Sequence, residues 1–322
     1  MDERYDVVVI GGGAAGLSGA VALTRSRRSV LVVDAGEPRN APAGHVHNYL
    51  AGEGTPPADL LAAGRAEVAG YGGRVVAGRV ATLERRDDGA FGVTLEDGRR
   101  TLARRLLVTT GLVDELPDVP GLAQRWGRDV LHCPFCHGWE ARDRAIGILA
   151  TGPMALHQAL MWRQLSDDVT VFRHTGPGFA DDELEQLAAR GIPVVDGEVV
   201  EVTVDGDRLT GVRLSSGEVV SRDVLVVSPR FTARSELLTM LGLEVAEQVV
   251  NGAVVGTFVP AEPTGATAVP GVWVAGNVTA LMAQVIGSAA AGLMAGAAIN
   301  GDLVLDDTRT AVAAARDLVA VS

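Results

Sequence analysis

The chain has 322 residues, of which 47% are hydrophobic and 21% charged, a balance typical of globular proteins that excludes a disordered or fibrous chain. All 28 cationic residues are arginines, and the absence of lysine excludes Schiff-base chemistry and any lysine-dependent phosphate loop. The 40 acidic residues give a net charge of −12, so neither nucleic acid nor an anionic membrane is expected as a partner. The length predicts about two domains.

Two segments bear on targeting. Residues 1–5 have neither the basic nor the apolar region of a secretion signal, so a cytoplasmic location is expected. The longest apolar stretch, residues 281–299, is rich in Ala, Gly and Ser and contains Gln284. This composition favours a buried helix packed through small residues over a membrane span.

The N-terminal region carries the clearest motif. An apolar run at residues 6–10, typical of a buried parallel strand, leads into the glycine-rich turn GGGAAG at 11–16. A helical pattern then covers residues 14–25, and a β-branched run at 29–33 ends in Asp34. This order predicts a βαβ unit with a G-x-G-x-x-G turn and an acidic residue behind it.

Each glycine of that turn has a physical role. Gly11 permits the tight turn, Gly13 lets the backbone approach a pyrophosphate, and Gly16 lets helix and strand pack closely. Asp34 is placed to accept hydrogen bonds from a ribose diol. The helix N-terminus supplies free N–H groups for phosphate oxygens, so the unit predicts dinucleotide binding.

The chain is less regular beyond this unit. Residues 36–57 form a Gly- and Pro-rich loop, and prolines near residues 117–121 mark a crossing into a second domain. The intervening pattern predicts a helix at 58–71 and strands at 74–83, 91–95 and 105–109.

A second α/β unit starts with a strand at 145–149, a helix at 154–165 and a strand at 169–172. The turn between the first strand and the helix is a degraded glycine-rich loop, in which Pro153 has no N–H to offer a phosphate. Arg173 and His174 follow in place of a basic cluster for a 2′-phosphate. The unit predicts a Rossmann-type domain with an eroded nicotinamide site.

The C-terminal part again has a strand followed by a glycine and a helix, as in the N-terminal region. Residues 271–277 predict a strand with a glycine exit, followed by the small-residue helix at 280–299. A final helix with a frayed end is expected from residue 301 onward.

The two cysteines, Cys133 and Cys136, lie in the segment HCPFCHGWE, where the C-x-x-C spacing lets them close a small disulfide ring. A structural zinc site would need four ligands, and the sequence has no second cysteine pair, so no metal is expected. His132 and His137 flank the pair and can carry protons near neutral pH, as thiol–disulfide exchange requires. The segment therefore predicts a redox-active cysteine pair. The alternative for the cysteines is two inert buried thiols, and the alternative for the flanking histidines is a solvated or capping role.

A C-x-x-C inserted between two segments of one dinucleotide domain resembles the low-molecular-weight thioredoxin reductase family. The resemblance covers essentially the whole chain, including the glycine-rich turn, the strand exit at 109–111 and residues 271–277. It implies an α/β fold of two Rossmann-like three-layer domains, with an FAD-binding domain at 1–115 and 241–322 split by an inserted redox domain at 116–240.

The same resemblance implies the cofactor contacts. FAD is expected to bind the split domain, and the helix near residue 280 would point its N-terminus at the flavin and stabilise the reduced anion. The residues carried over as FAD contacts are Gly11, Gly13, Ala15, Gly16, Asp34, Arg39, Asn48, Val80, Gly276, Asn277 and Gln284.

Several positions depart from the reductases. Besides the degraded nicotinamide loop, His137 stands where the family has an acid, and Asn277 replaces an Asp. The segment CPFCHG with a preceding His is similar to the dithiol-oxidase branch, whose members close the disulfides of holomycin, gliotoxin and romidepsin. By this resemblance Cys133 exchanges with substrate, Cys136 faces the flavin, and the flanking histidines relay protons.

The expected function is therefore an FAD-dependent dithiol oxidase that forms an intramolecular disulfide in a small natural-product dithiol. Electrons would pass through the Cys133–Cys136 disulfide and FAD to O2, which is released as H2O2. Two alternatives stay open: a thioredoxin reductase driven by NAD(P)H or ferredoxin, and a non-catalytic flavoprotein that binds a reactive dithiol. The family also implies a homodimer.

Overall fold

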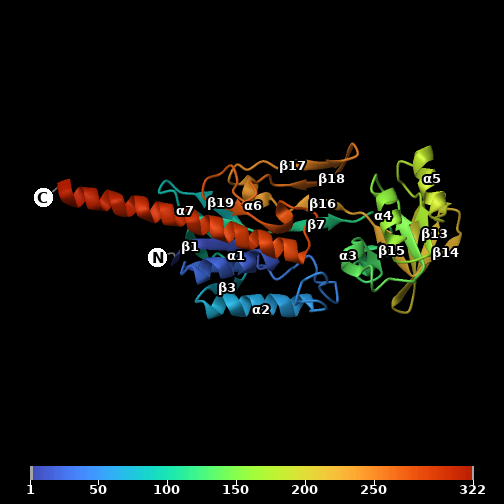
Figure 1. Ribbon diagram of the computed structural model, residues 1–322, viewed down its shortest axis with the longest axis horizontal. Helices are drawn as coiled ribbons and strands as arrows, with labels where there is room; N and C mark the ends of the chain where they lie inside the picture. The colour runs from blue at the N-terminus through green and yellow to red at the C-terminus, as the bar shows by residue number, and fades with distance from the viewer. Residues whose placement is uncertain (1–2, 321–322) are drawn as a thin grey trace.

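The computed structural model describes residues 3–320 and consists of two α/β units that lie end to end along the longest axis of the molecule (Figure 1). The larger unit combines the N-terminal and C-terminal parts of the chain, and the smaller unit is formed by the middle part. The short helix α3 (Pro134–His137) lies on the side of the smaller unit that faces the larger one (Figure 1).

The larger unit is organised around a seven-stranded sheet with β1 (Glu3–Ile10) at its centre. β1 pairs in parallel with β2 (Val30–Asp34) and with β6 (Arg100–Val108). Residues 7–10 are all buried because both faces of this strand are covered. The other strands are β3 (Arg74–Ala77), β4 (Val80–Arg85), β5 (Phe91–Leu95) and β19 (Val272–Val274), in the order β3-β2-β1-β6-β5-β4 with β19 beside β6.

The larger unit has three long helices, α1 (Ala14–Arg25), α2 (Pro57–Gly70) and α7 (Val285–Ala320). α1 and α7 pack in direct backbone contact, since a Cβ at Gly292 would collide with the backbone of Ala15. Residues 281–299 thus pack through small residues as predicted, but α7 begins at Val285 rather than 280. It also continues without a break where the sequence pattern predicts a separate final helix from residue 301.

Residues Val285–Leu318 are long and apolar enough to cross a membrane by length and composition alone, with 33% of the most apolar window buried. A single helix of this kind is weak evidence for a membrane span, because a core helix passes the same test. Ala295, Ile299 and Leu303 are completely buried against the central sheet and α1. This part of α7 is therefore a core helix of the folded unit.

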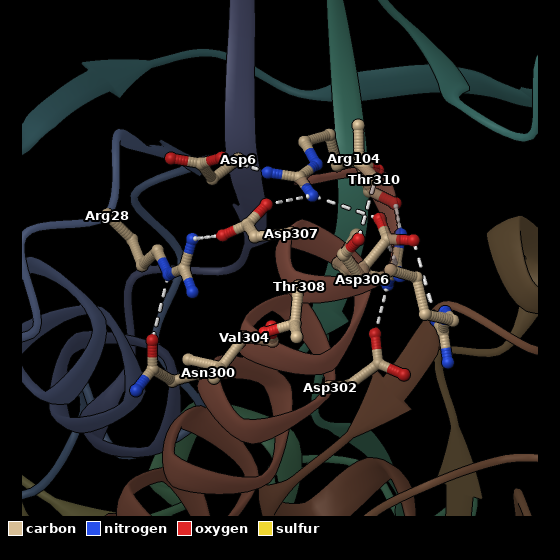
Figure 2. Close-up of polar contacts among 12 residues, drawn as sticks. Asp6, Arg28, Arg104, Asn300, Asp302, Val304, Asp306, Asp307, Thr308 and Thr310 are labelled. Carbon is tan, nitrogen blue, oxygen red and sulfur yellow. Dashed lines mark hydrogen bonds and ion pairs between the residues drawn. The ribbon is translucent and has the colours of Figure 1, made fainter. Parts of the chain in front are cut away.

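A network of charged side chains holds the middle of α7 to the sheet (Figure 2). Arg104 on β6 donates hydrogen bonds to Asp306 at 2.9 Å and to Asp307 at 2.6 Å. It also reaches Asp6 on β1 at 3.0 Å, and Arg28 donates to Asp307 at 2.6 Å. Segments that are distant in sequence are therefore joined at one point on α7.

The smaller unit contains two sheets. A parallel sheet in the order β11-β10-β9-β15-β8 packs with the helices α4 (Ala155–Trp162) and α5 (Asp181–Ala189). Its strands are β8 (Val130–Leu131), β9 (Ile146–Leu149), β10 (Val169–Phe172), β11 (Val194–Val195) and β15 (Val224–Val227). An antiparallel sheet contains β12 (Val199–Asp205), β13 (Arg208–Leu214) and β14 (Val219–Ser221), and a 3₁₀ turn, η1 (Ala123–Arg125), precedes β8.

The chain crosses between the units through β7 (Leu112–Glu115) and β16 (Arg230–Ala233), which pair antiparallel. They belong to a four-stranded sheet with β17 (Ala246–Val250) and β18 (Ala253–Phe258). Ala233, and Leu238 on α6 (Glu236–Thr239), pack into the core of the larger unit. Packing thus assigns residues 230–240 to the larger unit, which differs from the boundary predicted at residue 240, because the apolar side chains of this segment find their partners there.

Candidate active site

A cavity of about 660 Å³ extends from the glycine-rich turn of the larger unit to the cysteine pair of the smaller one. This volume lies within the range of small-molecule and cofactor sites. The cavity is lined by both cysteines, by four of the six histidines (His45, His47, His132 and His137) and by most of the residues expected to contact FAD. The lining residues of that set are Gly11, Gly13, Ala15, Asp34, Arg39, Val80, Gly276, Asn277 and Gln284.

The glycine-rich turn has the conformation that the sequence predicts. Gly11 has a φ of 106°, and a Cβ there would meet Thr109, whose hydroxyl donates to the Gly11 carbonyl at 2.9 Å. In contrast, nothing lies within 4 Å of a Cβ built on Gly13, which caps α1 without a side-chain hydrogen bond. The first N–H groups of α1 therefore face open space, which suits a phosphate group.

The acidic residue after β2 has a second role. One carboxylate oxygen of Asp34, Oδ1, accepts hydrogen bonds from the N–H groups of Gly12 and Gly36, both at 3.2 Å. Asp34 therefore braces the glycine-rich turn. Its contact with a ribose diol stays a prediction for the other oxygen.

Arg39 is held rigidly in the cavity wall. Its guanidinium donates two hydrogen bonds to Asp114 on β7, at 2.8 and 2.7 Å, and lies 5.2 Å from the ring centroid of Phe231 on β16. This arrangement neutralises the arginine and joins the loop after β2 to both crossing strands.

Asn277, in the 3₁₀ turn η2 (Gly276–Val278), holds the backbone segment that precedes α7. Its Nδ2 donates to the carbonyl oxygens of Ala280, Leu281 and Ala283, at 3.1, 3.2 and 2.9 Å. These bonds hold residues 280–283 as a loop, which explains why α7 begins at Val285. The Asn277 amide oxygen makes no hydrogen bond within residues 3–320 and is left to accept one from a ligand.

Two residues expected to contact FAD do not line the cavity. Gly16 lies behind the turn, where a Cβ would collide with the Gly11 carbonyl, so its role is the close packing of helix and strand. Asn48 has a φ of 58°, and its Nδ2 donates to the Phe135 carbonyl at 2.6 Å. Its side chain bonds the smaller unit instead of facing the cofactor cavity.

Cys133 and Cys136 form a disulfide, with their Cα atoms 5.3 Å apart. Cys133 is the N-cap of α3, and the N–H of Cys136 donates to its carbonyl at 3.1 Å. Gly138 is required by packing, since a Cβ there would collide with Pro134 and with Leu165. Within residues 3–320, no group of three or more His, Cys, Asp or Glu side chains is arranged to hold a metal ion.

His132 is oriented by its surroundings. Its Nδ1 lies 3.1 Å from the Val227 carbonyl, so Nδ1 donates and Nε2 carries the lone pair. The ring packs edge-on against Phe231, with centroids 5.3 Å apart. Burial lowers the pKa of His132 below its usual value, although the Val227 carbonyl partly offsets this. A neutral imidazole with a free Nε2 is suited to accept a thiol proton.

His137 finds no hydrogen-bond partner within residues 3–320. Both ring nitrogens are buried and make no hydrogen bond. Burial lowers the pKa of His137, the Glu140 carboxylate raises it, and the nearby His47 lowers it again.

Sequence reasoning treats His47 as scattered, but in the structure Nδ1 lies 2.6 Å from Glu53 and Nε2 lies 3.5 Å from Glu140. No sequence spacing signals the contact with Glu140, because it joins two segments distant in the chain.

The residues after β10 are engaged within the smaller unit. The Arg173 guanidinium lies 3.1 Å from the Asp196 carboxylate. His174 has a φ of 46°, and its Nδ1 accepts a hydrogen bond from the Val199 N–H at 3.2 Å. Both side chains thus contact neighbours within the smaller unit, and the erosion of the nicotinamide site stays a prediction.

Residues 5–296 match the family model of pyridine nucleotide-disulphide oxidoreductases. The chain belongs to this family. Among its relatives, thioredoxin reductase sirT of Leptosphaeria maculans is 31% identical over 92% of this chain and 93% of that protein. Thioredoxin reductase tcpT of Claviceps purpurea (strain 20.1) is 30% identical over 94% of this chain and 95% of that protein.

Solved structures give the same result. The crystal structure of HlmI superposes with a TM-score of 0.90 at 46% identity, covering 98% of this chain and 97% of that chain. An oxidoreductase from Agrobacterium tumefaciens has a TM-score of 0.86 at 34% identity, covering 94% and 99%. The predicted α/β class with Rossmann-type sheets and the resemblance to thioredoxin reductase-like flavoproteins are confirmed. The protein is therefore a flavin oxidoreductase.

Proposed function

We propose that the protein is an FAD-dependent dithiol oxidase that closes an intramolecular disulfide in a small-molecule dithiol. In this proposal electrons pass through the Cys133–Cys136 disulfide to FAD and then to O2, which leaves as H2O2. The observation that carries the proposal is the cavity itself: one continuous space connects the glycine-rich turn to both cysteines. Arg173 and His174, by contrast, are engaged in contacts of their own.

The residues present fit an FAD. The open space at Gly13 and the free N–H groups of α1 suit the pyrophosphate, and the Asn277 amide oxygen is available to a hydroxyl group. Gln284 and the start of α7 also line the cavity. When bound, FAD would supply the two-electron acceptor for the reduced cysteine pair.

The chain's own residues perform the sulfur chemistry. One substrate thiol gives its proton to a neutral histidine, and the resulting thiolate attacks Cys133. A mixed disulfide forms, and the electron pair of the Cys133–Cys136 bond stays on the Cys136 sulfur. The second substrate thiolate then attacks the mixed disulfide, which releases the cyclic product and leaves both cysteines reduced.

A thioredoxin reductase driven by NAD(P)H is the second candidate, because sirT and tcpT carry that name. One experiment on the purified flavoprotein distinguishes the dithiol oxidase from the thioredoxin reductase. An oxidase consumes O2 with a small dithiol such as dithiothreitol, and its flavin is not bleached by NADPH or NADH in anaerobic stopped-flow mixing. Rapid bleaching by either nucleotide, together with no O2 uptake, would overturn the oxidase proposal.

The double variant Cys133→Ser, Cys136→Ser tests the sulfur route. Neither cysteine supports the fold beyond the turn of α3, so the variant should keep its flavin absorbance. Its dithiol-dependent O2 uptake should fall to the level of free flavin. Turnover that persists would show that substrate reduces the flavin directly.

We propose in addition that the protein is a homodimer whose interface includes the outer face of α7. The exposed residues of this helix between 286 and 305 are all uncharged and apolar or glycine. They include Ile286, Leu293, Met294, Val304 and Leu305, each at least 42% exposed. An apolar face of this length is typical of a protein interface.

A further inference from the structure

The loop before α2 is fastened to the smaller unit next to the cysteine pair. A bridge between Val46 and Thr55 closes the loop, with the Val46 N–H donating at 2.8 Å. Asn48 then donates to the carbonyl of Phe135, one of the two residues between the cysteines, as described above. The position of His47 relative to α3 is therefore fixed from both sides.

Two carboxylates flank His47. The Glu53 carboxylate uses Oε1 to accept from His47 Nδ1 at 2.6 Å and Oε2 to accept from the Asn48 N–H at 2.8 Å. Because Nδ1 donates to Glu53, Nε2 is the nitrogen that exchanges a proton, and it faces Glu140 at 3.5 Å. The other titratable groups close to His47 are His45, with ring centroids 6.1 Å apart, and His137.

Exposure increases stepwise along this group of side chains. The ring nitrogens of His137 are buried and unpartnered. The His47 side chain is 18% exposed, that of Glu140 is 47% exposed and that of Glu53 is 64% exposed. His47 and His137 line the same cavity, so these side chains range from a buried imidazole, one residue after Cys136, to carboxylates that are open to bulk water.

We infer that His47, aligned by Glu53, is a positioning residue that takes up the proton collected by His137 and passes it to solvent. This inference rests on the proposed function. Each disulfide formed releases two electrons and two protons from the substrate, and the electrons reduce the Cys133–Cys136 bond. At least one proton has to leave a buried site, and the three side chains Glu53, His47 and Glu140 provide the exit.

The test uses the flavin-loaded protein under anaerobic conditions with dithiothreitol. Reduction of the Cys133–Cys136 disulfide is quenched with an alkylating reagent and measured by mass spectrometry, and flavin absorbance is followed in parallel, between pH 5.5 and 9. In His47→Gln the side-chain amide still donates a hydrogen bond to Glu53, but it does not take up or release a proton between pH 5.5 and 9. Disulfide reduction should slow by about 10-fold, with an altered pH profile, and added imidazole should restore the rate.

His157→Gln is the matched control, because His157 is exposed on α4 and does not line the cavity. It should behave as wild type. A His47→Gln protein with the wild-type rate and pH profile would overturn the inference but leave the oxidase proposal intact. A wild-type disulfide that dithiothreitol does not reduce would overturn the proposed function itself.

If His47→Gln loses its flavin or its fold, Glu140→Gln decides the question, since the Glu140 side chain is exposed. Its rate should fall less than that of His47→Gln, and its pH profile should change in the same direction. An unchanged profile in Glu140→Gln would overturn the inference.

Discussion

Single glycines decide whether the cofactor loop folds and whether it accepts a phosphate. Gly16→Ala should prevent the turn from closing, because the new Cβ collides with the Gly11 carbonyl. Gly13→Ala should leave the fold intact, because nothing lies within 4 Å of its Cβ, but the methyl group occupies the space of the pyrophosphate. We expect Gly13→Ala to match wild type in apo-protein Tm and to bind FAD at least about 10-fold more weakly. A full flavin content in Gly13→Ala would contradict this assignment.

Buried histidines set the pH dependence of stability. Burial lowers the pKa of His132, His137 and His174 below the ordinary value of 6.5, so the unfolded chain binds more protons just below that pH. Stability should therefore fall as the pH drops from 7.5 to 5.5.

His174→Asn should reduce this slope, because Asn keeps an acceptor for the Val199 N–H and tolerates the left-handed backbone. The measurement is Tm against pH. The exposed His157→Asn should keep the wild-type slope, and an unchanged slope in His174→Asn would contradict the explanation.

Local rules predict the glycine-rich turn and the cysteine pair, because each depends on neighbours in the sequence. They do not predict the orientation of Asn48, whose partner is the Phe135 carbonyl in the other unit. For the same reason, the contact of His47 with Glu140 emerges only in the folded chain, whereas its contact with Glu53 depends on how one loop folds. The motif correctly predicts that Gly16 lets helix and strand pack closely. The family resemblance also implies that Gly16 contacts FAD, but this residue does not line the cavity.

At the level of elements, α7 depends on charges contributed by other segments. The pKa of Asp306 is lowered by its hydrogen bond to Arg104, and the pKa of Asp307 by those to Arg28 and Arg104. Arg104→Met should lower the free energy of unfolding by about 1–3 kcal/mol at neutral pH, as measured by urea denaturation.

The sign of the pH effect follows from the direction of these shifts. Both carboxylates contribute stability above their ordinary pKa and lose it as the pH falls through the lowered value, so the deficit of Arg104→Met should shrink below about pH 4. Arg309→Met is the control, since Arg309 is 68% exposed and lies 3.4 Å from Asp306. An equal loss in both variants would contradict a specific role for Arg104.

The same network explains why the sequence pattern predicts two helices where there is one. Around residue 301 the apolar periodicity gives way to Asp302, Asp306 and Asp307, which indicates a solvated end of the helix. Their partners Arg28, Arg104 and Arg105 belong to other elements and neutralise them only after folding. β6, by contrast, begins earlier than predicted, because pairing with β5 recruits residues 100–103.

At the scale of the whole molecule, the apolar face of α7 predicts the oligomeric state. Leu293→Glu places a charge in the middle of this face and should convert a dimer into a monomer, as measured by light scattering coupled to size-exclusion chromatography. Leu318→Glu, near the end of the helix, changes a residue that is 76% exposed and should leave the dimer intact. A wild-type protein that is already monomeric would refute the interface.

The end-to-end arrangement of the two units has a practical consequence. α7 carries the chain away from the larger unit at the end opposite α3 (Figure 1). A purification tag, a fusion partner or a chemical anchor attached behind α7 would thus sit remote from the sulfur atoms. Immobilised on a resin or an electrode by this end, the protein should still present its cavity mouth to dissolved thiols.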